Sequence, residues 1–162
     1  MERSTSADGR RPGTPQARKP TLNEEYACFG LRLAPSKIHR WGVYTTEAIP
    51  AGRKVIEYTG EKISRRETKR RALASDMIYL FTLDPYWTID GAVGGSGAEY
   101  INHSCNPNLV ARIVKGHIIY ISLRAIRRGE ELTVDYHFDK KVDKVPCRCG
   151  ALTCRGTINV LK

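Results

Sequence analysis

The feature that most constrains this chain is a series of short runs rich in branched and aromatic residues, each bounded by turn signals. Such runs predict short β-strands, and Lys115-Gly116 and Arg128-Gly129 predict tight turns between them. The expected strands are residues 31–33, 42–45, 55–58, 78–83, 109–114, 117–123 and 132–134. One helix is expected after Ser64, because Ser64 and Glu67 form a capping-box pattern. The sequence therefore predicts a β-dominated α+β domain with several small sheets.

Length and charge narrow the class of protein. A chain of 162 residues with 41% hydrophobic residues has room for one domain with a core. It contains neither the run of about 18 apolar residues that a membrane span needs nor an apolar leader. We therefore expect an intracellular protein without membrane contact, in the nucleus of a eukaryote or the cytoplasm of a bacterium. The net charge of +10 favours acidic partners.

The chain is expected to divide into three parts. Residues 1–23 are rich in Arg, Pro, Gly, Ser and Thr, and we expect a disordered basic arm because they offer little apolar surface to bury. Residues 24–138 contain the predicted strands and helix and form the expected catalytic domain. Residues 139–162 contain three of the five cysteines and form the expected zinc-binding segment.

Two motifs carry the chemistry. Residues 99–108 spell Glu-Tyr-Ile-Asn-His-Ser-Cys-Asn-Pro-Asn, and residues 129–136 spell Gly-Glu-Glu-Leu-Thr-Val-Asp-Tyr. With Trp41-Gly42-Val43-Tyr44 and residues 57–61 upstream, they resemble the signature motifs of SET-domain methyltransferases, in the family's order. The resemblance covers roughly residues 30–157. It implies a SET fold with a pseudoknot-like active site and transfer of methyl groups from S-adenosylmethionine to lysine side chains of a histone or another protein. The chain resembles small stand-alone members of the family.

The resemblance also assigns residues. Tyr136 matches the catalytic tyrosine at the methyl-transfer centre, and Tyr79 matches the aromatic wall of the lysine channel. Both would also contact the cofactor, whose other expected contacts are Trp41, Gly42, Tyr44, Asn102, His103, Phe138, Arg148 and Leu152. Methyl transfer itself requires in-line alignment and a neutral amine, although free lysine has a pKa of about 10.4. The site must therefore desolvate the amine.

Two positions depart from the family's pattern. The family usually has glycine before the tryptophan, whereas this chain has Arg40, which questions the usual backbone path there. Val134 stands where the family commonly has Phe or Tyr in the pocket that limits methyl number. The smaller side chain favours di- or trimethylation over monomethylation.

The cysteine spacing indicates a metal site. Cys147, Cys149 and Cys154 form a Cys-x-Cys-x₄-Cys cluster, which leaves a tetrahedral zinc one ligand short. In the family's post-SET pattern Cys105 supplies the fourth ligand, and the zinc is structural. The competing interpretation is free buried cysteines or disulfides. Cys28 has no partner in this scheme, and we expect a small buried hydrophobic residue.

Two other functions remain open on sequence. The departures at Arg40 and Val134 suit a catalytically silent SET-like module that binds lysine-containing peptides. The basic composition and the zinc segment suit a nucleic-acid binder, or weak nucleic-acid contact by the basic surface and N-terminal arm of an enzyme. The sequence does not set the substrate protein or the oligomeric state.

Overall fold

The central sheet of the computed structural model, which describes residues 19–74, 79–138 and 143–160, has five strands. Their order across the sheet is β3 (Lys54–Tyr58), β9 (His117–Ser122), β8 (Leu109–Val114), β10 (Thr133–Val134) and β7 (Asn102–His103). β8 and β9 form an antiparallel hairpin, and its turn residues Lys115 and Gly116 both have positive φ, 50° and 82°. That two-residue turn matches the twist of the strands. The expected strands at these positions are confirmed.

The two sequence motifs meet at β7 and β10. These strands are parallel, with Thr133 opposite Asn102 and Val134 opposite His103. Because β10 also pairs with β8, it lies between two strands that follow each other in the chain, and residues 104–108 cross over it. Asn108 fixes the crossing: its Nδ2 donates to the Glu131 carbonyl at 2.8 Å, and its Oδ1 accepts from the Thr133 amide at 2.8 Å. This crossing is the expected pseudoknot-like arrangement.

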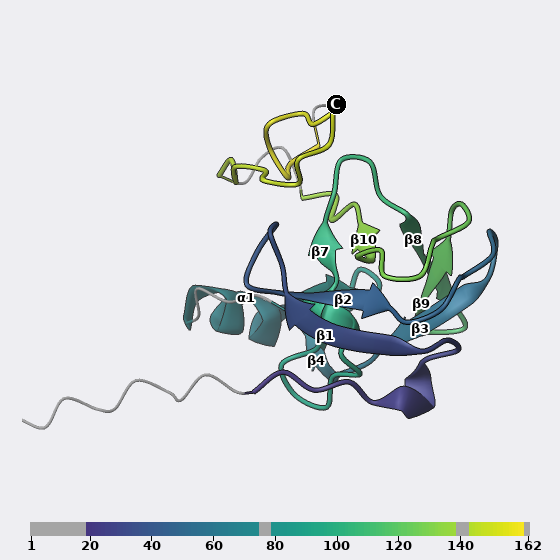
Figure 1. The fold of residues 1–162 in the computed structure, drawn as a ribbon. Coiled ribbons are helices and arrows are strands. Elements are labelled where there is room, and N and C mark those ends of the chain that lie inside the picture. The colour runs from purple at the N-terminus through teal and green to yellow at the C-terminus, as the bar shows by residue number, and fades with distance from the viewer. Residues whose placement is uncertain (1–18, 75–78, 139–142, 161–162) are drawn as a thin grey trace, which may run out of the picture.

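Two smaller sheets flank the central one. β1 (Leu31–Pro35) and β2 (Trp41–Thr45) form an antiparallel hairpin. The other sheet has the order β4 (Glu61–Ser64), β6 (Trp87–Asp90) and β5 (Leu80–Thr82). Single 3₁₀ turns occur at η1 (Glu24–Tyr26) and η2 (Ala98–Tyr100). Figure 1 shows β1 and β2 in front of the central sheet and the helix at one side. The structure therefore has several small sheets, as the sequence predicts.

The α-helix of the described residues, α1 (Arg65–Ala74), begins as expected after Ser64, whose Oγ accepts from the Glu67 amide at 3.3 Å. Glu67 does not complete the capping box, because its carboxylate instead binds Arg70 and Arg71. Arg71 also contacts Glu61 at 2.7 Å and Asp90 at 2.5 Å. No residue of α1 is buried. Charge pairs rather than an apolar face therefore join the helix to β4 and β6.

A single hydrophobic core lies between the central sheet and the β1–β2 hairpin. Its fully buried side chains include Val43, Val55, Ile56, Ile118 and Leu132. Val55 and Ile56 are neighbours in β3 and are both fully buried, because the register of β3 against β9 shifts between Lys54 and Ile56. The core therefore fixes β3 and β9, and the motif strands β10 and β7 belong to the same sheet.

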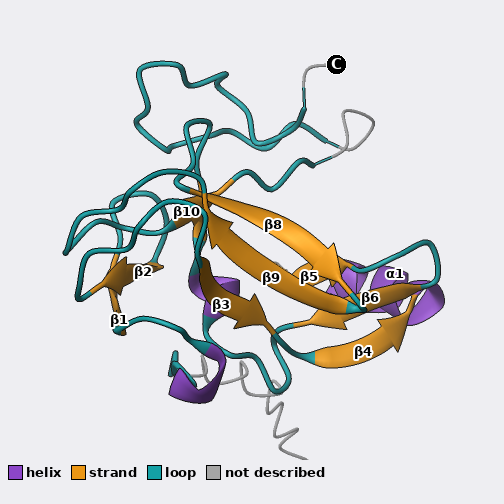
Figure 2. Cartoon of the chain, turned by 90° about the vertical axis from the view of Figure 1, so that its right-hand side faces the viewer, coloured by secondary structure: helices purple, strands orange, loops and turns teal. Residues whose placement is uncertain are grey.

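Residues 143–160 of the expected zinc-binding segment, called here the C-terminal segment, contain no helix or strand (Figure 2). Isolated bridges join Pro146 to Thr157 within it and Asn159 to Phe138 outside it. Most of the expected basic arm (residues 1–18), Ile78 of one expected strand, and residues 139–142 and 161–162 lie outside the described residues. In the described part of the chain, no helix is long and apolar enough to cross a membrane.

The expectation for Cys28 is wrong, because its side chain is exposed. The neighbouring Ala27 packs against the core and bridges to Ile56, while the Cys28 amide donates to the Val55 carbonyl at 2.8 Å. Since successive residues of an extended segment face opposite sides, an inward Ala27 turns Cys28 outward.

Candidate active site

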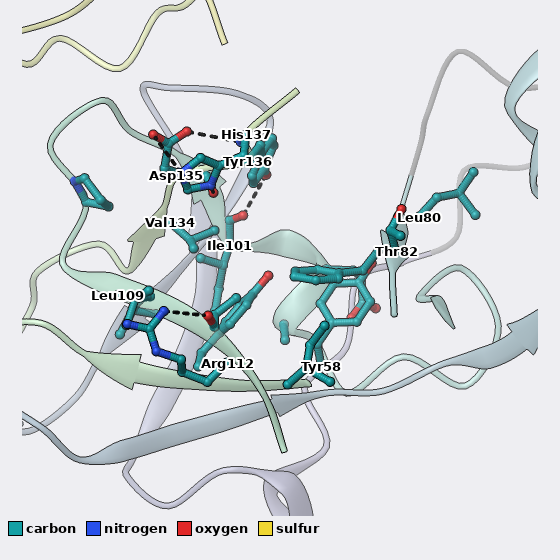
Figure 3. A pocket seen from close by; sticks show the side chains of 18 of the residues that line it. Tyr58, Leu80, Thr82, Ile101, Leu109, Arg112, Val134, Asp135, Tyr136 and His137 are labelled. Atoms are coloured by element: carbon teal, nitrogen blue, oxygen red, sulfur yellow. Dashed lines mark hydrogen bonds and ion pairs between the residues drawn. The ribbon is translucent and has the colours of Figure 1, made fainter. Parts of the chain in front are cut away.

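A cavity of about 850 Å³ lies between β5, β8 and residues 134–138. Four of the predicted site residues line it: Tyr79, Val134, Tyr136 and Phe138. Tyr58, Phe81 and Tyr120 add an aromatic wall, with ring centroids 5.4–6.3 Å apart. In Figure 3, Val134 and Tyr136 come from one side of this cavity, and Tyr58, Leu80 and Thr82 from the other. The cavity therefore combines aromatic walls and phenol groups with charged residues, which include Glu99, Arg112 and Asp135.

Two contacts hold the Tyr136 side chain at the cavity, one through its hydroxyl and one through its ring. Its hydroxyl donates to the Ile101 carbonyl at 2.7 Å (Figure 3), and its ring stacks on Phe138 with centroids 5.8 Å apart. Although 37% of the residue is exposed, burial of the hydroxyl end raises the pKa of Tyr136, and the nearby Tyr79 and Glu131 add to the rise. The phenol is therefore protonated and neutral at physiological pH.

Tyr79 lies just before β5, at the cavity wall. Its carbonyl accepts from the Tyr58 hydroxyl at 2.5 Å and from the Gly91 amide at 2.8 Å. Its ring meets Tyr100 edge to face, with centroids 5.6 Å apart. Burial raises the pKa of Tyr79, as it does for Tyr58 and Tyr120. The four tyrosines of the cavity are therefore uncharged at neutral pH, and none supplies a ready general base.

The predicted cofactor residues of β2 form a second group, outside the lining of this cavity. The Asn102 carboxamide connects the group: its Nδ2 lies 2.9 Å from the Trp41 carbonyl and 3.3 Å from the His39 carbonyl. The residue between them, Arg40, has φ 44°. Arg40 thus adopts the left-handed backbone conformation that favours glycine, although it carries a side chain. The loop keeps that conformation with arginine in place.

Glu131 is a site residue to which sequence analysis assigns no role. Its Oε1 accepts from the Ser36 hydroxyl at 2.7 Å and from Asn102 Nδ2 at 2.8 Å, and its Oε2 accepts from the Tyr44 hydroxyl at 3.0 Å. A Cβ on Gly42 would lie 2.4 Å from Oε1, so only glycine leaves room for the carboxylate. Gly42 thus contacts an acidic residue about ninety positions later in the sequence. A contact between such distant residues leaves no signature in a local sequence pattern.

His103 connects Tyr136 to the cysteines. It is buried, its Nδ1 accepts from the Tyr136 amide at 3.2 Å, and its Nε2 lies 3.5 Å from Cys105 Sγ. Because Nδ1 is an acceptor, the proton of the neutral ring is on Nε2, facing the sulfur. Burial lowers the pKa of His103, which keeps this neutral form. His103 therefore orients the backbone at Tyr136.

The four predicted zinc ligands, Cys105, Cys147, Cys149 and Cys154, come together with all sulfurs within 4.8 Å of one another. Cys105 Sγ lies 3.7 Å from Cys147 Sγ and 3.9 Å from Cys154 Sγ. Tetrahedral zinc with Zn–S bonds of about 2.3 Å places its sulfurs about 3.8 Å apart. The cysteines are free rather than paired in disulfides. Their arrangement fits a closed four-thiolate zinc site.

The ionisation of these thiols also suits a cation. Burial raises the pKa of Cys147 to about 12 and raises the pKa of Cys105. Although burial opposes it, the backbone amides of Cys105 and Ala151 lower the pKa of Cys149 to about 6. The Cys149 thiolate thus lies beside Cys105 and Cys147, whose ionisation is disfavoured. A divalent ion at the centre removes that conflict, because a coordinated thiol loses its proton.

Arg155 joins the C-terminal segment to the catalytic motif. Its guanidinium makes two parallel contacts of 2.8 Å with Asp135, the residue before Tyr136. It also donates to the carbonyls of Ile158 and Asn159. Burial raises the pKa of Asp135, but the hydrogen bonds from Arg155 outweigh burial and leave it below its usual value. The pair is an ion pair at neutral pH and fixes the segment beside the cavity.

Two predicted cofactor residues lie apart from both groups. Arg148 is exposed in the C-terminal segment, and Leu152 is fully exposed. Neither lines the cavity.

Comparison with known proteins agrees with this geometry. The family model of the SET domain matches residues 40–137, which contain both motif segments and the cavity's tyrosines. This chain belongs to the SET-domain family. The β7–β10 crossing, the tyrosine cavity and the cysteine cluster are thus features of a SET domain followed by a cysteine-containing segment.

Curated relatives share this region. The chain is 42% identical over 138 residues to "Histone-lysine N-methyltransferase SETD1" of Drosophila melanogaster, covering 80% of this chain and 8% of that protein. It is 42% identical over 138 residues to "Histone-lysine N-methyltransferase, H3 lysine-4 specific" of Schizosaccharomyces pombe, with 80% and 15% covered. To "Histone-lysine N-methyltransferase trithorax" of Drosophila virilis it is 40% identical over 147 residues, with 86% and 4% covered. The chain therefore matches only a small part of each relative's length.

Proposed function

We propose that this protein transfers methyl groups from S-adenosylmethionine to the side-chain amine of lysine in a protein substrate. The observation that carries the proposal is the Tyr136 hydroxyl, fixed at 2.7 Å to the Ile101 carbonyl at the wall of an aromatic cavity in a SET-domain chain. The names of the relatives, which are histone-lysine N-methyltransferases, support the reaction class.

The chemistry of the cavity suits a lysine amine. Because the Tyr136 proton is committed to Ile101, the lone pairs of its oxygen remain free to accept a hydrogen bond from an incoming amine. The aromatic part of the wall, formed by Tyr58, Phe81 and Tyr120, disfavours an ammonium ion by desolvation, which promotes the neutral amine that methyl transfer needs. When bound, S-adenosylmethionine supplies the methyl group on a positively charged sulfur. Tyr136 would then orient the nucleophile rather than take its proton.

The second group of residues suits the cofactor. Trp41 is 40% exposed and offers an aromatic face, and the carbonyls of His39 and Trp41 lie beside Asn102. An adenine ring and an ammonium group are recognised by such faces and acceptors. We propose that Trp41, Gly42, Tyr44, Asn102 and His103 hold the cofactor, with Tyr79, Tyr136 and Phe138 at its reactive end. Arg148 and Leu152 would join only if the C-terminal segment moves towards it.

A peptide substrate has a place to bind. Among the described residues, β5 pairs only with β6, and beyond Leu109 no strand pairs with the edge of β8 that faces away from β9. Both strands line the cavity. An extended peptide can hydrogen-bond to such free edges while one side chain enters the cavity. Val134, buried and small, would leave room there for di- or trimethylation.

We further propose that residues 24–138 form the catalytic domain and that residues 139–162 close it through a structural Zn²⁺ bound by Cys105, Cys147, Cys149 and Cys154. The bidentate contact of Arg155 with Asp135 supports this role, because it fixes the segment beside Tyr136. A histone tail is the first substrate to test, since the relatives' names specify histones. A histone substrate would place the protein in the nucleus.

The competing nucleic-acid function has weaker support. The arginines of α1 are the most concentrated basic group of the described residues, yet Arg70 and Arg71 are paired with carboxylates. Their positive charge is partly neutralised, so we propose only weak, salt-dependent nucleic-acid contact.

Transfer of labelled methyl from S-adenosylmethionine tests the function. Zinc-loaded protein is incubated with histones, ribosomal proteins and cell extract, and wild type is compared with Tyr136→Phe, which keeps the ring and loses the hydroxyl. We expect labelled lysine with wild type and a fall of about 100-fold with the variant, because the amine loses its alignment. Tyr86→Phe is the matched control, since Tyr86 is exposed outside the cavity.

The outcomes separate the functions. Equal labelling by wild type and Tyr136→Phe contradicts the assigned role of Tyr136. Cofactor binding without labelling of any substrate in the panel favours the silent peptide-binding module. A shift of nucleic acid that is steeply salt dependent, without cofactor binding, favours the nucleic-acid binder.

A further inference from the structure

Glu131 accepts hydrogen bonds from three segments of the predicted cofactor region. The donors are the Ser36 hydroxyl at 2.7 Å, the Tyr44 hydroxyl at 3.0 Å and Asn102 Nδ2 at 2.8 Å. They come from the turn after β1, from the next strand β2, and from β7, which is about sixty residues further along the chain. A carboxylate has only acceptors to offer, and here its two oxygens meet three donors. The acceptors of the Glu131 carboxylate therefore match the donors that surround it.

These donors also fix the loop before Trp41. The Ser36 amide donates to the Arg40 carbonyl at 2.9 Å, and the Ile38 amide donates to Ser36 Oγ at 3.0 Å. Ser36 thus makes two hydrogen bonds within this turn, and its hydroxyl donates a third to Glu131. Arg40 sits in that turn at φ 44°, which is unfavourable for a residue with a side chain. Surrounding contacts must hold such a conformation in place.

Asn102 is oriented by the same contact. Its Nδ2 faces Glu131 and the carbonyls of His39 and Trp41, so the nitrogen is directed towards acceptors on every side. The carboxamide oxygen of Asn102 is therefore directed away from these three acceptors. Glu131 itself is fixed, because it bridges antiparallel to Tyr44 and the next amide, of Leu132, donates to the Val43 carbonyl at 2.8 Å. A rigid backbone therefore presents the carboxylate.

We propose that Glu131 is a positioning residue, which holds residues 36–41 and the Asn102 carboxamide in the geometry that binds the cofactor before the cofactor arrives. The inference rests on the proposed function for the identity of that cofactor. It makes the affinity for S-adenosylmethionine depend on a side chain that acts through Ser36, Tyr44 and Asn102. Preorganisation of this kind raises affinity by increasing the fraction of protein that is ready to bind.

Two substitutions at this position separate geometry from charge. Glu131→Gln keeps the network: its oxygen can face Ser36 and Asn102, and its amide can donate to the Tyr44 oxygen. The Tyr44 proton then goes to the Pro35 carbonyl, which is already 3.2 Å away. Glu131→Ala removes every acceptor. Glu130→Ala is the matched control, because Glu130 is adjacent in sequence but pairs with Arg124.

The experiment measures binding and loop exchange in zinc-loaded protein. Dissociation constants for S-adenosylmethionine and S-adenosylhomocysteine come from calorimetry, and hydrogen exchange of residues 36–41 is followed without cofactor. If the competent state falls to about a tenth in Glu131→Ala, both dissociation constants rise about tenfold. We also expect faster exchange of residues 36–41, unchanged exchange in β3 and β9, and a larger effect on KM for S-adenosylmethionine than on kcat. Glu131→Gln and Glu130→Ala should stay within about twofold of wild type.

Two results overturn the proposal. The first is unchanged exchange of residues 36–41 in Glu131→Ala, or wild-type affinity for both ligands in that variant. The second is a Glu131→Gln variant as defective as Glu131→Ala, which would make charge rather than geometry the cause. Wild type that binds both ligands but methylates nothing defeats the proposed function while leaving this test intact. If wild type binds neither ligand, the proposed function fails and the exchange of residues 36–41 alone decides the role of Glu131.

Discussion

The central sheet and the C-terminal segment are held in place by different forces. In the sheet, Val55, Ile56 and Ile118 are at most 1% exposed and pack in one core. Within residues 143–160, the buried residues are Thr157 and Asn159, which are polar, and Leu152 is fully exposed. The segment depends on hydrogen bonds, the Arg155–Asp135 pair and the four-cysteine cluster. We therefore expect burial to fold the sheet alone and the segment to need a metal ion for docking.

The difference matters because the proposed active site lies on the boundary. Tyr136 and Phe138 follow β10 of the sheet, and the Phe138 carbonyl accepts from the Val160 amide at 2.8 Å. Cys105 belongs to the crossing of residues 104–108, and the other three cysteines belong to the segment. Activity is thus expected to require both regions, although stability of the sheet requires only one.

Metal removal should give the largest effect. Chelation of zinc, or Cys147→Ser, should abolish protection from hydrogen exchange in residues 143–160 and reduce methyl transfer to background, because zinc binding supplies the energy of docking. Amides of β3, β8 and β9 should stay protected. Cys28→Ser is the control, since Cys28 is exposed outside the cluster. If the sheet unfolds together with the segment, the two regions are one cooperative unit and the comparison fails.

A substitution in the core should act on the whole domain. Ile118→Ala, at a position 1% exposed in β9, should lower the free energy of unfolding by about 2–5 kcal/mol in urea denaturation of zinc-loaded protein. Ile113 is its cross-strand partner in β8 but is 50% exposed, so Ile113→Ala should cost about 0.5 kcal/mol. Similar losses for the two variants would show that burial does not distinguish the two strands of this hairpin.

Loss of the ion pair should act on the segment alone. Arg155→Gln removes the two contacts with Asp135, and we expect the opening free energy of residues 143–160 to fall by about 1.5–3 kcal/mol. Hydrogen exchange measures that opening, and Lys144→Gln, an exposed change in the same segment, is the control. A shift in the urea midpoint of the sheet as large as that of Ile118→Ala would contradict the separation.

A surface pair of the sheet domain should matter least. Arg124 lies 3.0 Å from Glu130, but its side chain is 52% exposed. Solvent screens such pairs, so Arg124→Gln should change the free energy of unfolding by less than about 1 kcal/mol. Urea denaturation in low and high salt is the measurement. An effect above that of Arg155→Gln would show that exposure does not rank the two pairs.

Local patterns predicted most of the strands whose inward face is apolar, but they missed β4, in which Ile63 is the one buried residue. They missed β6, because its inward residues are Thr88 and Asp90, which bind Arg65 and Arg71 instead of packing in the core. They missed β7 because two residues make no pattern, and its partner β10 is about thirty positions away. Polar inward faces and long-range pairing have no signature in a short window of sequence.

The candidate site shows the same limit. The family's motifs identified Tyr136 and the four cysteines, and the structure brings those cysteines together. Nothing local distinguishes Glu131 from Glu130, yet the first turns to Ser36 and Asn102 and the second to Arg124. Cys28 was predicted wrongly because its exposure depends on Ala27 facing Ile56, a contact between distant segments.

The crossing of residues 104–108 over β10 sets an order of events in folding. The β8–β9 hairpin is local and can form early, whereas β10 must pair in parallel with β7 across about thirty residues of intervening chain. Loop closure of that kind is slow, and Tyr136 reaches its place only when it is complete. A refolding chain should therefore gain its sheet signal first and its methyl-transfer activity last.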